Sequence, residues 1–324
     1  MLFGKKPVFI GLHFAKTGGT SIRAHAAKNL RKGEFFPYGV FAHANNFFSG
    51  RPMLAEMSPR QKAKFRFLYG HGVSTDVLHH FADREIALFV VCRDPYKRFL
   101  SSLKHVVRTQ RQFGGMVDPR EVYENQPANP FANSVMKHFG DLAPDDVSDP
   151  KERLLAVLRC FRFVMSTDDL NAQTRPFFNA LDLPEMTEAK RVYKEEADIG
   201  SLSEAEIRAR DDLDAFVNEA VNDYYASGKT AKLAKGPINP FGFDQSQLNA
   251  RMKAFSAAAL PIEEDIEQAY VTLFGFLDRH GRLEAAKVLI DAGRQSKRTA
   301  EIFARFCGDT GRSFEDRDPP SRTM

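Results

Sequence analysis

A short polar segment near the start of the chain has the residue types that bind a phosphate-like anion. It reads H-F-A-K-T-G-G-T-S over residues 13–21, and it follows an apolar run at 7–14 that contains β-branched members. Two glycines let the backbone approach an anion closely, and the free amides at the start of a following helix point towards it. Lys16 adds a positive charge, and three hydroxyl side chains add donors. Because this lysine precedes both glycines, the segment is not the standard P-loop of nucleotide triphosphatases. The alternative interpretation is an ordinary strand-to-helix turn with a solvent-facing lysine.

A second cationic segment follows the strongest strand pattern in the sequence. The continuous apolar run E-I-A-L-F-V-V-C at 85–92 is typical of a strand buried on both faces, and Arg93 stands at its carboxyl end. Asp94 and Pro95 then provide a helix N-cap and a first helical residue. Ser101 lies two turns into this helix, so a guanidinium and a hydroxyl can meet on one phosphate. The alternative is that the basic side chains of this helix only cover an exposed face.

Other elements indicate how the two segments are brought together. Further strands are expected at 65–69 and 161–166. Helices are expected at 22–30, 151–160 and 168–181. Strands that alternate with helices form parallel sheets, and open parallel sheets bind ligands at the carboxyl ends of their strands. We therefore expect an α/β fold in which both cationic segments lie at one edge of a central parallel sheet.

The last third of the chain has a helical pattern. Ser203 and Glu206 fit a capping box at the start of an amphipathic stretch. Further helices are expected at 262–277, 283–294 and 299–306. The division that follows is a domain at 1–228, a linker rich in Lys, Gly and Pro at 229–243, and a helical C-terminal extension with a disordered end at 244–324.

Composition and charge limit the function classes. A chain of 324 residues that is 43% hydrophobic can bury a sizeable core. No apolar run reaches the ~20 residues of a membrane-spanning helix, and three widely separated cysteines without metal-ligand spacing indicate reduced thiols in a cytoplasmic protein. Residues 1–33 carry seven Lys/Arg and no acid, which favours an anionic ligand. No nucleic-acid-binding motif is present, so a polynucleotide partner is not expected.

Taken in this order, K-T-G-G-T-S at 16–21 and R-D-P-x-x-R-x-x-S at 93–101 resemble the donor-binding pair of the sulfotransferase family. The likeness is to its carbohydrate branch, which includes the heparan sulfate 2-O- and 6-O-sulfotransferases, and it covers roughly residues 7–228. It implies a bacterial member of that branch. The resemblance implies a P-loop-like three-layer fold and 3′-phosphoadenosine 5′-phosphosulfate (PAPS) as the sulfonate donor. It also implies a hydroxyl acceptor, expected to be a carbohydrate, and no metal. The donor-binding residues that it implies are Lys16, Thr17, Gly18, Gly19, Thr20, Ser21, Arg93 and Ser101.

An alcohol attacks poorly until its proton is removed, and a histidine accepts protons near neutrality. Among nine histidines we favour His71, which directly follows the expected strand at 65–69 and stands in a G-H-G-V segment similar to one in the 2-O-sulfotransferases. The reserve candidates are His43, His79 and His80. His105 is expected to pack near the donor, and His13 to lie inside the first strand with a structural role.

In the expected reaction, His71 takes the proton of the acceptor hydroxyl while Lys16 stabilises charge on the leaving phosphate. Two alternatives stay open. The first is a nucleotide-dependent kinase on a similar sheet. The second is a non-catalytic nucleotide-binding scaffold that uses its helical tail for partners.

Overall fold

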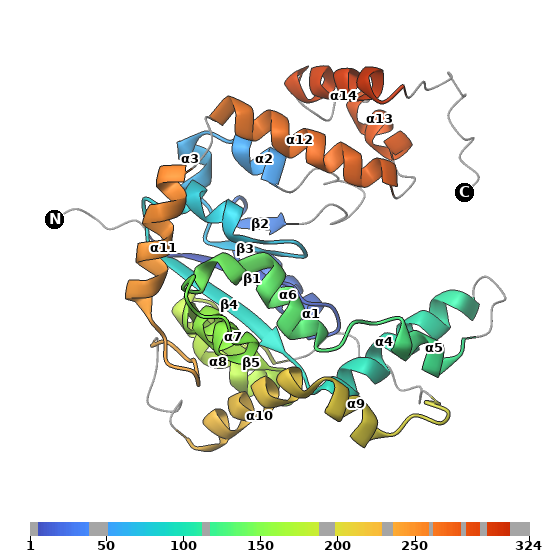
Figure 1. The fold of residues 1–324 in the computed structure, drawn as a ribbon. Coiled ribbons are helices and arrows are strands. Elements are labelled where there is room, and N and C mark those ends of the chain that lie inside the picture. Colours follow the sequence, from blue (N-terminus) through green and yellow to red (C-terminus); the bar gives the residue numbers. More distant parts are fainter. Residues whose placement is uncertain are drawn as a thin grey trace. The chain divides into compact units, whose positions relative to one another are not determined.

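A five-stranded sheet forms the centre of the fold (Figure 1). The computed structural model describes residues 6–38, 51–111, 117–187, 198–228, 236–258, 262–279, 283–291 and 297–311. The strands are β1 (Val8–Leu12), β2 (Phe35–Tyr38), β3 (Phe67–Gly70), β4 (Ile86–Cys92) and β5 (Phe161–Ser166). They lie in the order β2-β3-β1-β4-β5, and every neighbouring pair is parallel. The expected α/β class with a central parallel sheet is confirmed.

Most strands coincide with the sequence expectation. β1, β3, β4 and β5 begin and end within a few residues of the apolar runs that predicted them. β2 was not predicted, because its four residues F-F-P-Y give no periodic pattern and include a proline. The strand lies at an edge of the sheet, where a proline is tolerated because one side of the strand needs no hydrogen-bond donor.

Helices connect the strands. Around the sheet they are α1 (Gly19–Asn29), α3 (Pro59–Lys62), η1 (Thr75–Phe81), α4 (Pro95–Arg111), α5 (Pro119–Glu124), α6 (Pro130–Phe139), η2 (Gly140–Leu142), α7 (Pro150–Arg159), α8 (Leu170–Ala180), α9 (Glu204–Arg210), α10 (Asp212–Ala226) and α11 (Gln245–Ala258). The predicted N-caps are present. Asp94 accepts the amide of Lys97 at 2.9 Å, and Asp149 accepts that of Glu152 at 2.8 Å.

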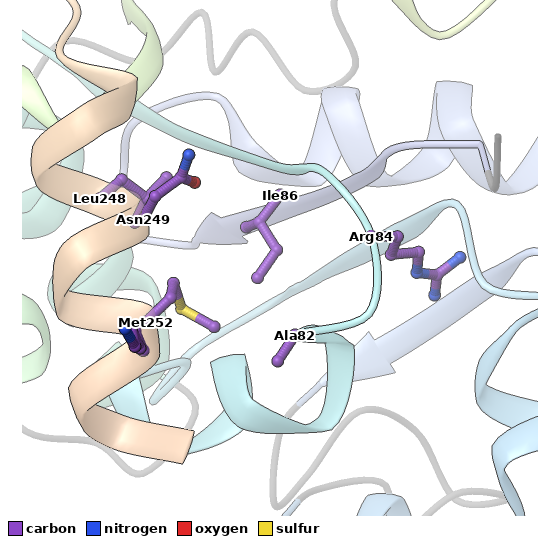
Figure 2. A pocket seen from close by; sticks show the side chains of 7 residues that line it. Ala82, Arg84, Ile86, Leu248, Asn249 and Met252 are labelled. Atoms are coloured by element: carbon purple, nitrogen blue, oxygen red, sulfur yellow. The ribbon is translucent and has the colours of Figure 1, made fainter. Parts of the chain in front are cut away.

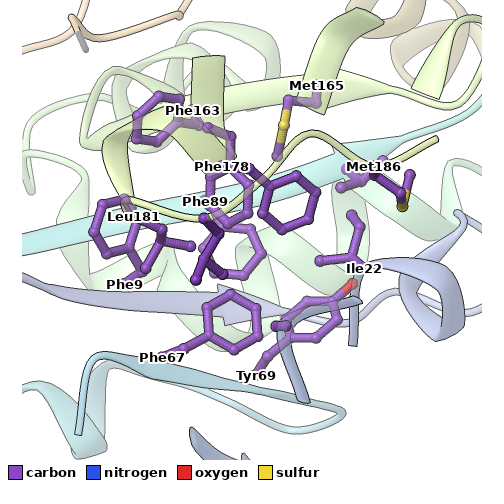
Figure 3. Close-up of a cluster of buried hydrophobic side chains, with 14 of the residues drawn as sticks. Phe9, Ile22, Phe67, Tyr69, Phe89, Phe163, Met165, Phe178, Leu181 and Met186 are labelled. Atoms are coloured by element: carbon purple, nitrogen blue, oxygen red, sulfur yellow. The ribbon is translucent and has the colours of Figure 1, made fainter. Parts of the chain in front are cut away.

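The main core lies between one face of the sheet and helices α1 and α8 (Figure 3). Alternate residues of the strands, such as Phe9, Phe67 and Phe89, meet Ile22 of α1 and Phe178 of α8 there. The opposite face of the sheet is also buried, and on it the ring of Phe139 in α6 packs edge-on against Phe161 at 5.2 Å. Helices on both faces explain why the strands are continuous apolar runs, and they are consistent with a three-layer α/β arrangement.

The chain divides into two compact units whose boundaries differ from the expected ones. The first unit contains residues 1–38 and 59–258, and the second contains 39–58 and 259–324. In the second unit, α2 (Arg51–Glu56) packs on α12 (Ile262–Arg279), where the phenol of Tyr270 donates to Glu56 at 2.9 Å. Its other helices are α13 (Leu283–Asp291) and α14 (Lys297–Asp309). The last dozen residues, which were expected to be disordered, lie outside the described residues.

The described part of the expected linker is packed within the first unit. Ile238 is fully buried and forms a parallel bridge with Phe163 of β5. The following helix α11 is tied to the same unit, because Gln247 donates to the carbonyl of Leu142 at 2.8 Å and Arg251 donates to that of Ala143 at 2.6 Å. Residues 236–258 therefore complete the sheet domain, although the composition of 229–243 is typical of a linker.

The long helical stretch expected after Ser203 is broken at Asp211, which separates α9 from α10. The Ser203 side chain caps α9 as predicted, accepting the amide of Glu206 at 3.1 Å. None of the described helices combines the length and the apolar character needed to cross a bilayer.

Candidate functional site

The parallel register places the two cationic segments at the same end of the sheet, where the strands have their carboxyl ends. Leu12 of β1 pairs with Gly70 of β3 on one side and with Val90 of β4 on the other. The residues that follow these strands therefore leave the sheet side by side, as the expected ligand edge of a parallel α/β fold requires. The sequence-predicted Lys16, His71 and Arg93 all lie in these three connections.

The loop at 13–18 has a backbone that few sequences allow. Lys16 and Gly18 both have left-handed conformations, with φ of 70° and 71°. A Cβ on Gly18 would stand 2.8 Å from a methyl carbon of Leu170, and one on Gly19 would stand 2.1 Å from Cδ2 of His13. Both glycines are therefore needed for the close approach of the loop to its neighbours, which also brings the loop backbone within reach of a ligand.

The start of α1 offers donors to an anion. The helix begins at Gly19 with no acidic residue in its first turn and no side-chain cap on its amides. The hydroxyl of Thr17 instead donates to the carbonyl of Phe14 at 2.8 Å and so closes the loop. Thr17 and Ser21 are buried, whereas Thr20 is exposed. This helix N-terminus and Lys16 together favour negative charge.

Arg93 joins the two segments directly. Its Nη1 donates to the backbone carbonyl of Lys16 at 2.9 Å. Its Nε is buried and has no hydrogen-bond acceptor among the described residues. Burial lowers the pKa of the guanidinium, and the nearby carboxylates of Asp168 and Asp94 oppose that shift. A half-buried cation therefore lies against the loop, where a guanidinium keeps its charge.

The remaining residues of the R-D-P helix divide between the site and the core. Ser101 is half-buried on α4, and it makes no hydrogen bond to Arg93 or to the loop among the residues that the structure describes. Arg98 is buried and forms an ion pair with Asp211 at 3.2 Å. The interpretation of Arg98 as part of an exposed helix face was therefore wrong, whereas Lys97 does lie at the surface.

His71 lies at the same edge of the sheet, and it is stacked on a second histidine. The ring centroids of His71 and His13 are 4.0 Å apart, with the planes inclined by 24°. His71 is exposed as a residue, but its inner face is covered. Desolvation lowers the pKa of its imidazole, a hydrogen bond with the backbone of His13 raises it, and Arg23 lowers it. The net direction is downward, which keeps the ring neutral and able to accept a proton near neutrality.

The other histidines lie elsewhere. His79 and His80 belong to η1, where their rings are 3.9 Å apart, and His105 is exposed on α4. His43 falls outside the described residues. His13, which was expected inside the first strand, follows the end of β1 and lies in the site. The clue that could have found it is its place directly after a strand, the same clue that identified Arg93.

Asp168 is a second site residue that the sequence analysis missed. It follows β5 closely and accepts hydrogen bonds from Lys97 at 2.6 Å, from Asn218 at 3.1 Å and from Asn222 at 2.7 Å. Burial would raise the pKa of this carboxyl, but these bonds outweigh burial and hold the pKa below its usual range. The carboxylate therefore stays charged beside Arg93 and ties α10 to the carboxyl end of β5.

A separate cavity of about 450 Å³ lies near the amino-terminal end of β4 (Figure 2). Its lining comes from the start of β4, the residues before it and α11, namely Ala82, Arg84, Ile86, Leu248, Asn249, Met252 and Lys253. The guanidinium of Arg84 is engaged by the carbonyls of Ala63 and Lys62, at 3.2 Å and 2.7 Å. Ile86 begins β4 and Arg93 follows its end, so this cavity is distinct from the candidate site.

Within the described ranges, no group of three His, Cys, Asp or Glu side chains is placed to hold a metal ion. The absence of a metal requirement stays a prediction. Comparisons of the chain with protein-family models, with curated proteins and with solved structures gave no significant match.

Proposed function

We propose that this chain is a sulfotransferase that moves a sulfonate group from PAPS to an acceptor hydroxyl, with a carbohydrate as the expected acceptor. The observation that carries the proposal is the contact between Arg93 and Lys16, because it unites the two motifs of the family resemblance in one site. Had the two residues lain at different edges of the sheet, one nucleotide could not have touched both.

The chemistry of the loop supports a donor with two anionic ends. Lys16, the amides at the start of α1 and the hydroxyls of Thr20 and Ser21 would bind the 5′-phosphosulfate. Arg93 and Ser101 would bind the 3′-phosphate, and the buried Nε of Arg93 is a donor that still lacks an acceptor among the described residues. The residues therefore suit a bisphosphorylated adenosine, and the proposal includes a P-loop-like fold for the sheet domain.

The reaction needs one proton transfer and one displacement. His71 accepts the proton of the acceptor hydroxyl as the oxygen forms its bond to sulfur. The bond between sulfur and the bridging phosphate oxygen breaks, and adenosine 3′,5′-bisphosphate leaves with the negative charge. Lys16 stabilises that charge, which is the electrostatic part of the catalysis.

Binding and turnover test the proposal separately. Adenosine 3′,5′-bisphosphate should raise the unfolding temperature of the protein more than ATP with Mg²⁺ does, because bound ligand stabilises only the folded state. Preferential stabilisation by ATP with Mg²⁺ would favour a kinase, and no response to either ligand would contradict a nucleotide site.

Turnover is measured with ³⁵S-labelled PAPS and a panel of oligosaccharides, tyrosyl peptides and small alcohols. We expect transfer to an oligosaccharide, and losses of about 10²-fold or more in Lys16→Ala and His71→Ala. Near-normal rates in both variants would overturn these residue roles. Binding of adenosine 3′,5′-bisphosphate without transfer to any acceptor would favour the scaffold alternative.

A further inference from the structure

His13 is held firmly between the loop and His71. Its backbone amide donates to the carbonyl of Gly70 at 2.9 Å, which extends the pairing of β1 with β3 by one residue. Its ring stacks on His71 at 4.0 Å and on Tyr69 at 5.1 Å, with interplanar angles of 24° and 27°. The same ring lies against Gly19, where an added Cβ would meet it at 2.1 Å.

We propose that His13 is a positioning residue: its ring supports the inner face of His71 and sets the direction in which that imidazole faces the anion-binding loop. The inference rests on the proposed function, in which His71 is the general base. His13 itself touches no reacting atom in this proposal, because His71 covers its outer face. A base held by a rigid neighbour keeps its geometry through the reaction, which is how positioning residues contribute to rate.

The charges around the pair suit this arrangement. Burial, then His71, then Arg23 lower the pKa of His13 to about 3, so its ring is neutral at neutral pH. Three groups face the two imidazoles from the neighbouring elements: the phenol of Tyr69 on β3, the guanidinium of Arg23 on α1, and the imidazole of the other histidine. Burial strongly raises the pKa of Tyr69, so that phenol is neutral as well. His71 can therefore gain a proton beside an uncharged His13 ring, and the charge that opposes this gain is the guanidinium of Arg23.

Two measurements distinguish a positioning role of His13 from a purely structural one: the affinity for adenosine 3′,5′-bisphosphate and the titration of His71. Since His13 touches both the loop and His71, its loss could weaken donor binding, proton transfer or both. A residue that only supports the loop would change the affinity for adenosine 3′,5′-bisphosphate and leave the titration of His71 alone. A residue that positions His71 changes that titration directly.

The test is the NMR titration of the ¹⁵N- and ¹³C-labelled imidazole of His71 in the full chain, with His13→Ala, His13→Phe and His13→Gln. His13→Ala should move the midpoint of His71 up towards its ordinary value of about 6.5, because the ring face becomes hydrated. His13→Phe keeps a flat ring and should leave the midpoint low. His138→Ala, which removes a half-buried histidine on α6, is the matched control and should leave His71 unchanged.

Turnover provides the second readout. His13→Ala should lower kcat about 10-fold to 10²-fold. Its Kd for adenosine 3′,5′-bisphosphate should stay within about twofold of the unsubstituted value, well under the tenfold that 1.4 kcal/mol represents. If His13→Ala does not fold, His13→Gln replaces it with the same expected shift. A folded variant without the ring whose His71 midpoint is unchanged would overturn the inference. If no PAPS turnover is found for the unsubstituted protein, the proposed function fails, while the NMR titration still decides the relation between the two histidines.

Discussion

The guanidinium of Arg98 lies 3.2 Å from the carboxylate of Asp211, and both side chains are buried. Arg98 belongs to α4, the helix within the second cationic motif, whereas Asp211 is the residue that separates α9 from α10. Asp211 also accepts the backbone amide of Asn129 at 2.9 Å. The pair therefore fixes α4, which carries Ser101 and follows Arg93, to the junction between α9 and α10.

Breaking this pair should destabilise the protein strongly. Arg98→Met leaves the carboxylate of Asp211 buried without its cation, which costs about 3–5 kcal/mol of unfolding free energy. Urea unfolding measures the loss. The exposed pair of Arg175 and Glu185, 3.1 Å apart, provides the control, since Arg175→Ala should cost less than about 1 kcal/mol. A comparable small cost for Arg98→Met would show that water reaches Asp211.

Gly19→Ala should damage the loop. The added Cβ would lie 2.1 Å from the ring of His13 and 2.4 Å from the hydroxyl of Tyr69, so either ring must move. We expect a loss of about 1–3 kcal/mol in unfolding free energy, together with weaker binding of adenosine 3′,5′-bisphosphate. Calorimetry measures both. Gly140→Ala is the matched control, because its Cβ would meet only a methionine methyl at an ordinary 3.5 Å, and it should leave both quantities unchanged.

Arg93→Ala should weaken nucleotide binding at least tenfold, because one charge-assisted hydrogen bond contributes about 1.5–3 kcal/mol. The variant also loses the bond to the carbonyl of Lys16, so the strained loop backbone is less well held. Isothermal titration with adenosine 3′,5′-bisphosphate gives the Kd. Arg175→Ala, which removes an exposed cation, should bind as the unsubstituted protein does. Equal affinities for the Arg93 and Arg175 variants would mean that Arg93 is outside the nucleotide site.

The half-buried imidazole of His13 predicts a dependence of stability on pH. Its pKa is about 3 in the folded protein and about 6.5 when the chain is unfolded. The unfolded state therefore binds more protons between these values, and the stability present above about pH 6.5 is lost as the pH falls towards 3. Urea midpoints at pH 7.5 and 5.0 should differ more for the unsubstituted protein than for His13→Gln. Equal differences would place the imidazole in water.

Local patterns in the sequence determined the elements of the sheet domain that hold the candidate site residues. The apolar runs predicted β4 and β5, Asp94 and Asp149 predicted two helix starts, and the glycines predicted the loop. Each of these features depends on residues close together in the chain: hydrophobic periodicity, a capping side chain, or a backbone that needs glycine. For the same reason the sequence alone placed Arg93 directly after the carboxyl end of a strand.

Tertiary structure decided which distant residues meet. The stacking of His13 on His71, the Arg98–Asp211 pair and the bridge of Ile238 to Phe163 each join residues that no local pattern connects. The strand register fixed the first of these contacts, and burial against neighbouring helices fixed the other two. Such contacts depend on the free energy of packing the whole domain, so a polar or linker-like segment becomes core wherever the fold buries it.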